Sequence, residues 1–190
     1  EIDFAGNVTT DGAFTLGLQN SSAAGNIIVG DTNNATGDLD LTAAELAFIQ
    51  PGLTSITIGS AAQTGTTTIA ADVAFNTSVL FVTDVTGSTL ISGGNITSTG
   101  TVTFTSDVTS SGGARSVTGT AVTFDRTLTT GGGLFTVAAG AGTATFTGAV
   151  NIAGASLTVT GANATFTSTV DGANTLDTSG VTTLTTFNGL

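Results

Sequence analysis

The chain has 190 residues, enough for one domain with a buried core or for part of a repeat array. It contains 43 Thr and 27 Gly but no Cys, His, Lys, Met, Trp or Tyr, and its two Arg face thirteen carboxylates, for a net charge of −11. This composition excludes thiolate, imidazole and ordinary zinc chemistry. It also leaves no basic patch to bind nucleic acid or an anionic membrane, and no apolar run is long enough to span a membrane as a helix.

An oxygen-rich segment, residues 31–40, lies in the first quarter of the chain. Its candidate calcium ligands are Asp31, Asn33, Asp38 and Asp40, because Ca²⁺ prefers carboxylate and amide oxygens. Their spacing matches neither an EF-hand nor the glycine-rich nonapeptide of calcium-binding β-rolls. We therefore predict a solvated turn, with calcium binding as the alternative. No catalytic residue, other metal ligand or cofactor-binding residue is predicted anywhere in the chain.

Residues 42–50 form the one predicted helix, since they are rich in Ala, Leu and Glu. Thr42 and Glu45 have the spacing of a capping box, in which each side chain bonds to the backbone of the other residue. Pro51-Gly52 ends the helix. We expect about two turns that shield the apolar core of the fold.

The run LTAAELAFIQPGLTSITIGSAAQTGTTTI, residues 41–69, resembles a segment that recurs in very large secreted repeat proteins of bacteria. Those proteins are similar to filamentous haemagglutinin and to other β-helical adhesins. The Thr- and Gly-rich residues 95–190 resemble their repeats in composition. The resemblance implies a right-handed parallel β-helix in a stalk, filament or adhesin at the bacterial cell surface or in the extracellular matrix. It implies no catalytic residues.

From residue 95 onward the chain repeats with a period of about 20 residues. An apolar–Thr–Phe motif recurs as VTFTSDV (102–108), VTFDRTL (122–128), ATFTGAV (144–150) and ATFTSTV (164–170), and a fifth copy starts at Thr185. In a stack of coils, residues of the same type recur once per coil because each residue lies above its counterpart on the coil below. The competing fold, an antiparallel sandwich, gives no reason for this period. We predict an all-β parallel β-helix, expected to be right-handed, with about 20–21 residues per coil.

Within each motif, apolar and polar residues alternate as in a strand with one buried face. The predicted inward stack consists of Phe104, Phe124, Phe146, Phe166 and Phe187. The predicted outward Thr ladder consists of Thr103, Thr105, Thr123, Thr145, Thr147, Thr165 and Thr167.

Two upstream segments, IDFAGNV (2–8) and VAFNTSV (73–79), carry the same Phe motif. We interpret both as further copies of this motif, so residues 1–94 are expected to form irregular coils with insertions. The whole chain is then expected to be one β-solenoid segment of roughly eight or nine coils, about 40 Å long. Since it begins and ends inside a Phe motif, it is expected to be a fragment of a longer repeat protein.

The leading functional prediction is a non-enzymatic structural or adhesive segment of a secreted bacterial surface or filament protein. Open coil edges at both ends predict end-to-end self-association or continuation into further repeats, with host or matrix glycans and proteins as further candidate partners. The alternatives are a polysaccharide-binding or polysaccharide-active β-helix, and an ice-binding solenoid that uses its Thr ladder. The charged residues Asp107, Asp125, Arg115 and Arg126 are predicted to form surface ion pairs rather than a catalytic cluster.

Overall fold

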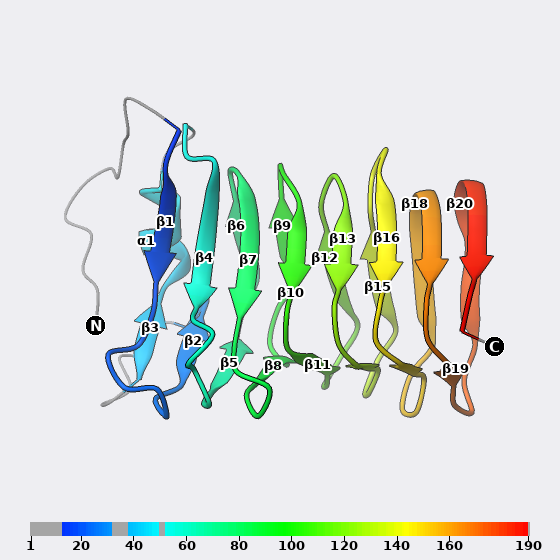
Figure 1. Cartoon of the computed structure of the whole chain (residues 1–190), viewed down its shortest axis with the longest axis horizontal. Coiled ribbons are helices and arrows are strands. Elements are labelled where there is room, and N and C mark those ends of the chain that lie inside the picture. The colour runs from blue at the N-terminus through cyan, green and yellow to red at the C-terminus, as the bar shows by residue number, and fades with distance from the viewer. Residues whose placement is uncertain (1–12, 32–37, 50–51, 190) are drawn as a thin grey trace.

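The computed structural model describes residues 13–31, 38–49 and 52–189 (Figure 1). Its strands stack as a parallel β-solenoid, and every pairing between neighbouring strands is parallel. The predicted all-β parallel β-helix is confirmed. Figure 1 shows the successive levels side by side along the long axis of the molecule.

Each complete coil places one strand on each of three faces. Face 1 contains β1 (Thr15–Leu18), β4 (Ser55–Gly59), β7 (Ser78–Val82), β10 (Val102–Phe104), β13 (Val122–Phe124), β16 (Thr143–Phe146) and the second halves of β18 (Leu157–Phe166) and β20 (Leu176–Phe187). Face 2 contains β2 (Ile27–Val29), β3 (Leu39–Leu41), β5 (Thr66–Ile69), β8 (Ser88–Ile91), β11 (Asp107–Ser110), β14 (Leu128–Thr129), β17 (Val150–Asn151) and β19 (Val170–Asp171). Face 3 contains β6 (Val73–Phe75), β9 (Ile96–Ser98), β12 (Arg115–Thr118), β15 (Phe135–Ala138) and the first halves of β18 and β20.

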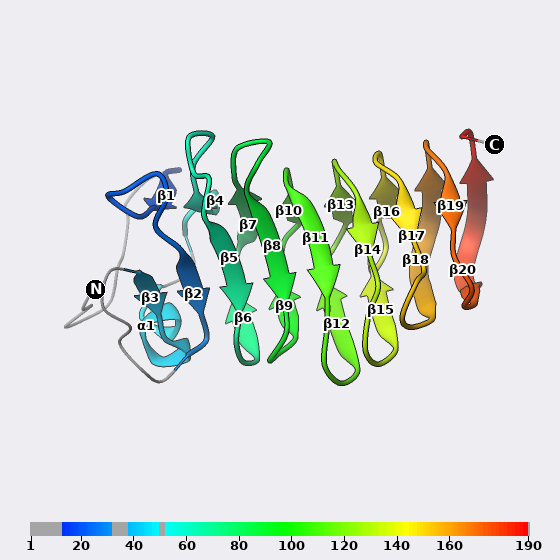
Figure 2. The same cartoon turned by 90° about the horizontal axis from the view of Figure 1, so that it is seen from below.

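About six coils are complete, fewer than the eight or nine expected. Faces 1 and 2 each have eight levels of strands, but face 3 has six. The difference arises at the N-terminal end, where helix α1 (Ala43–Ala47) lies beside β6 (Figure 2). Regular three-strand coils begin at β4, earlier than the boundary predicted at residue 95. The upstream motif at residues 2–8 lies outside the described residues.

Helix α1 begins and ends where the sequence predicts, within two or three residues. The Thr42 hydroxyl accepts a hydrogen bond from the Glu45 backbone N–H at 3.2 Å, and Glu45 Oε2 accepts one from the Thr42 backbone N–H at 2.7 Å. Leu46 and Ile49 are buried in the hydrophobic core. The helix therefore shields the N-terminal end of the core, as expected from its local sequence.

A column of six Phe rings runs through the core behind face 1. The rings of Phe81, Phe104, Phe124, Phe146, Phe166 and Phe187 stack nearly parallel, with successive centroids 5.0, 5.0, 5.3, 4.6 and 4.9 Å apart. The five residues assigned to this stack from the sequence all lie in it. Phe166 is only 1 % exposed, whereas Phe187, on the last level, is 42 % exposed.

The segment at 73–79 is not a copy of the face 1 motif, because its Phe75 does not belong to this column. Phe75 lies on face 3, and its ring meets Phe81 edge-on at 6.1 Å. Phe81, six residues later on β7, is the residue that pairs with Phe104. The sequence pattern is ambiguous here because an inward Val followed two positions later by an inward Phe occurs on both face 1 and face 3. In addition, Leu80 precedes Phe81, whereas Thr precedes the Phe on the later levels of face 1, so the motif around Phe81 is harder to recognise.

Two buried hydroxyl groups on face 2 lead to a stability prediction. Thr67 and Thr89 occupy equivalent inward positions, and both are fully buried. Thr89 Oγ1 lies 2.9 Å from the Ser106 hydroxyl, but Thr67 Oγ1 has no hydrogen-bond partner among the described residues. Because Val has the shape of Thr without its hydroxyl, Thr67→Val should raise the free energy of unfolding by about 1 kcal/mol in urea titrations.

Thr89→Val is the matched control for this prediction. It removes a bonded hydroxyl and leaves that of Ser106 buried and unpaired, so it should lower the same free energy by about 1 kcal/mol. Effects of equal sign in the two variants would contradict the assignment of Thr67 as the unpaired group.

Candidate functional site

The first candidate surface is the outward Thr ladder of face 1. Thr103, Thr123, Thr145 and Thr165 lie opposite one another in register on successive strands. Thr186 continues the column to the last level, and Leu80 ends it on the N-terminal side. The column therefore has five levels, one more than the sequence-based ladder. Thr186 is the second residue of the fifth Phe motif, so applying the ladder position to that copy would have identified it.

The second column of the predicted ladder does not form a flat array. Thr105, Thr147 and Thr167 lie just after the strands, at the corner of the coil. The Thr167 hydroxyl donates to the Phe146 and Thr147 carbonyls at 3.2 and 3.0 Å, and that of Thr105 donates to the Phe81 carbonyl at 3.4 Å. On the intervening level the corner residue is the exposed Asp125. A surface that binds ice would therefore be one Thr column wide, beside a projecting charge.

The predicted calcium loop is only partly described. Asn33 lies outside the described residues, Asp31 and Asp38 are half-buried, and Asp40 is buried. Asp38 Oδ1 accepts a hydrogen bond from the Asn26 backbone N–H at 3.0 Å, so it serves the corner before β2. Residues 13–31, 38–49 and 52–189 contain no group of three or more carboxylate, imidazole or thiol side chains that could hold a metal ion.

The charged residues of the regular coils serve local structure. Arg126 Nε lies 3.6 Å from Asp107 Oδ1, and both side chains are partly exposed. Arg115 Nε donates to the Ser92 carbonyl at 3.1 Å. A solvent-screened pair at this distance stabilises a fold by at most about 1 kcal/mol. Of the four residues predicted to form surface ion pairs, Arg126 and Asp107 form one, whereas Arg115 binds a backbone carbonyl and Asp125 is exposed at a corner.

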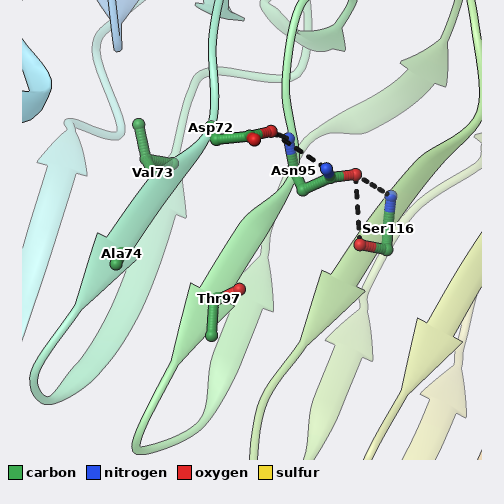
Figure 3. A pocket seen from close by; sticks show the side chains of 6 residues that line it. All are labelled: Asp72, Val73, Ala74, Asn95, Thr97 and Ser116. Carbon is green, nitrogen blue, oxygen red and sulfur yellow. Dashed lines mark hydrogen bonds between the residues drawn. The ribbon is translucent and has the colours of Figure 1, made fainter.

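A shallow groove on face 3 is the second candidate surface, and sequence reasoning missed it. It has a volume of about 290 Å³ and is formed by residues of the first three levels, β6, β9 and β12 (Figure 3). Its lining residues are Asp72, Val73, Ala74, Asn95, Thr97 and Ser116. The side chains of Ala74 and Ser116 are small, so the surface is lower there than at the neighbouring side chains of Asp72, Asn95 and Thr97.

A chain of hydrogen bonds fixes the polar side of the groove. Asp72 Oδ1 accepts from the backbone N–H and the side-chain Nδ2 of Asn95, at 2.8 and 2.9 Å. Asn95 Oδ1 in turn accepts from the backbone N–H and the hydroxyl of Ser116, at 2.8 and 3.1 Å (Figure 3). Asp72 Oδ2 lies outside this chain of bonds. A carboxylate here attracts hydroxyl or ammonium donors and repels anionic ligands.

The polar residues of the groove form a regular series in the sequence, but this series can be recognised only once the register of the coils is known. Asp72, Asn95 and Ser116 each directly precede an inward residue of face 3, and they are separated by 23 and 21 residues. The Phe motif marks face 1 only, so the repeat that it defines does not reveal a polar series on another face.

Comparisons with known proteins add no family to these observations: no family model, no curated protein and no solved structure matches the chain. No helix among the described residues is long and apolar enough to cross a membrane.

Proposed function

We propose that the chain is a non-enzymatic structural segment of an extracellular bacterial surface filament or adhesin. The observation that carries this proposal is the unbroken stack of levels. Parallel backbone pairing connects each level to the next along the described solenoid, and six stacked Phe rings run through the last six levels of face 1. Such a stack is a stiff rod in which every level contacts only its neighbours.

The surface chemistry supports the same role. The outward side chains of face 1 form a Thr column, and the charged fraction of the chain is only 8 %. The segment that resembles secreted haemagglutinin-like proteins, residues 41–69, contains helix α1 and the first two strands of the first regular coil, β4 and β5. A net charge of −11 discourages nonspecific association with anionic surfaces.

Antibodies raised against the purified chain would test this proposal on intact cells of the source organism. We expect immunogold labelling of unpermeabilised cells or of the surrounding matrix, and an immunoblot band far above 18.4 kDa. Labelling that requires permeabilised cells would contradict the extracellular role. A band at the mass of this chain would contradict its place in a larger filament.

Saccharide binding in the groove of face 3 is the second candidate function, favoured by the hydrogen-bond chain from Asp72 to Ser116. Pooled neutral glycans should perturb amide NMR signals of β6, β9 and β12 only. Ala74→Leu, which fills the groove, should abolish the perturbation. Asp125→Asn, a change at the corner after β13, should leave it intact. Perturbation spread over all three faces, or none at all, would refute this function.

A further inference from the structure

The groove on face 3 contains a negative charge that no cation of the described chain neutralises. Asp72 is exposed at one side of the groove. The protein has only two arginines and no lysine: Arg126 pairs with Asp107, and Arg115 donates to the Ser92 carbonyl. In the part of the chain that the structure describes, the Asp72 carboxylate therefore has no ion-pair partner.

Backbone donors fix the direction of the hydrogen bonds in the groove. The backbone N–H of Ser116 can only donate, so the side-chain oxygen of Asn95 faces it, at 2.8 Å. The side-chain nitrogen of Asn95 then faces Asp72 and donates to its Oδ1, at 2.9 Å. Because Asn95 Oδ1 has no hydrogen, the Ser116 hydroxyl donates to it at 3.1 Å. The side-chain hydrogen bonds thus run in one direction, from Ser116 through Asn95 to Asp72 (Figure 3).

This direction leaves acceptor oxygens at both ends of the chain of hydrogen bonds. The Ser116 hydroxyl has used its only hydrogen and keeps acceptor lone pairs, and Asp72 Oδ2 is an acceptor that the chain of bonds does not use. A primary ammonium group has three donors, no acceptor and the opposite charge, so it matches the Asp72 end. A ligand carboxylate, sulfate or phosphate would instead be repelled there.

The rest of the groove suits a ligand that also carries hydroxyl groups. Ala74 and Thr97 lie opposite each other in register, so a methyl group and an exposed hydroxyl lie side by side. The second hydrogen of Asn95 Nδ2 is a further donor. The three levels of the groove extend over about 10 Å. A sugar chain presents C–H groups and hydroxyls over such a length, whereas a lysine side chain presents one point charge on an apolar stem.

We propose that the groove binds a saccharide with free amino groups, such as an oligomer of hexosamine units that are not acetylated. An ammonium group of the sugar would bind Asp72 Oδ2, and its hydroxyls would bind Thr97 and Ser116. The proposal rests on the saccharide-binding function proposed above for this groove and names its ligand class. Acetylation of the amine removes the positive charge and two donor hydrogens, so it is the chemical difference that the groove would detect.

Two sugars that differ only at their amino groups test the proposal: a trimer of glucosamine and the same trimer with its amines acetylated. Each is titrated into the full chain, at a pH at which the free amines are protonated, while amide NMR signals are recorded. The free-amine trimer should perturb signals of β6, β9 and β12 only, and should bind about tenfold more tightly than the acetylated trimer. Equal affinities would overturn the proposal and leave saccharide binding in place. Binding of neither trimer would overturn both.

Asp72→Asn and Asp125→Asn form a matched pair of variants, because each removes one exposed carboxylate from a chain with a net charge of −11. The new side chain at position 72 keeps an oxygen that can accept from Asn95. Asp72→Asn should abolish the preference for the free-amine trimer, whereas Asp125→Asn should leave it unchanged.

Equal losses of affinity in the two variants would overturn the proposal, because they would show only a general attraction of cations to an acidic chain. Equally tight binding of trilysine at the same signals would also overturn it, since the groove would then recognise any ammonium group rather than a sugar. None of these results affects surface labelling of cells, so the structural function is tested separately.

Discussion

Replacing Phe146 by Ala should lower the free energy of unfolding by about 3–5 kcal/mol. The side chain is fully buried, and its ring stacks between those of Phe124 and Phe166, at centroid distances of 5.3 and 4.6 Å. The levels above and below are held apart by their backbone hydrogen bonds, so they cannot collapse into the space that the ring leaves. The cost therefore includes both the lost apolar burial and the cavity.

Phe187→Ala is the control for this variant, since Phe187 belongs to the same column but has only one neighbouring ring. It should cost less than half as much as Phe146→Ala, because much of the side chain is already exposed. Urea unfolding followed by circular dichroism would measure both variants. A loss below about 1 kcal/mol for Phe146→Ala would show that the column is not closely packed.

Replacing Gly132 by Ala should lower the same free energy by about 2–5 kcal/mol. Gly132 has a φ of +80°, where an L-residue costs about 1–2 kcal/mol. An added Cβ would also lie 2.1 Å from the Gly112 carbonyl oxygen of the preceding level. Relieving that overlap requires a backbone shift, which costs a further 1–3 kcal/mol or so.

Gly113→Ala, in the same series of corners, is the matched control for the Gly132 variant. Its Cβ would have a single neighbour, Arg115 Nη1 at 3.5 Å, and its φ is not in the left-handed region. It should change the free energy of unfolding by less than about 1 kcal/mol. Similar losses of unfolding free energy in the two variants would contradict this explanation, because the close approach between levels affects only Gly132.

The regular C-terminal half of the fold could be predicted because residues separated by one sequence repeat are also the residues that pair between adjacent levels. Once Phe104 and Phe124 are recognised as equivalent, every residue between them is placed on a face and on a level. The helix could be predicted from local chemistry alone, since the hydrogen bonds of its capping box join residues three positions apart.

Prediction failed where a position depends on the path of the coil rather than on the motif. Phe75 and Phe81 both have apolar neighbours at alternate positions, and only the corner between them decides which one joins the column. Thr105 and Thr167 follow the strand pattern in the sequence, but the coil turns before them. The groove could not be predicted because it depends on small side chains, such as that of Ala74, on a face that has no recurring Phe in the sequence.

The level-by-level register gives this protein an adjustable length. Val122 and Ala144 are equivalent partners on adjacent levels, so removing residues 122–143 would bring Ala144 into the place of Val122 and Phe146 into that of Phe124. The strand pairing between levels would be kept on all three faces, although the ion pair between Asp107 and Arg126 would be lost. A gene that lost or gained the codons of one coil by unequal recombination would encode a chain with the same strand pairing between its levels. The reach of the rod can therefore change between generations without any change in how it folds.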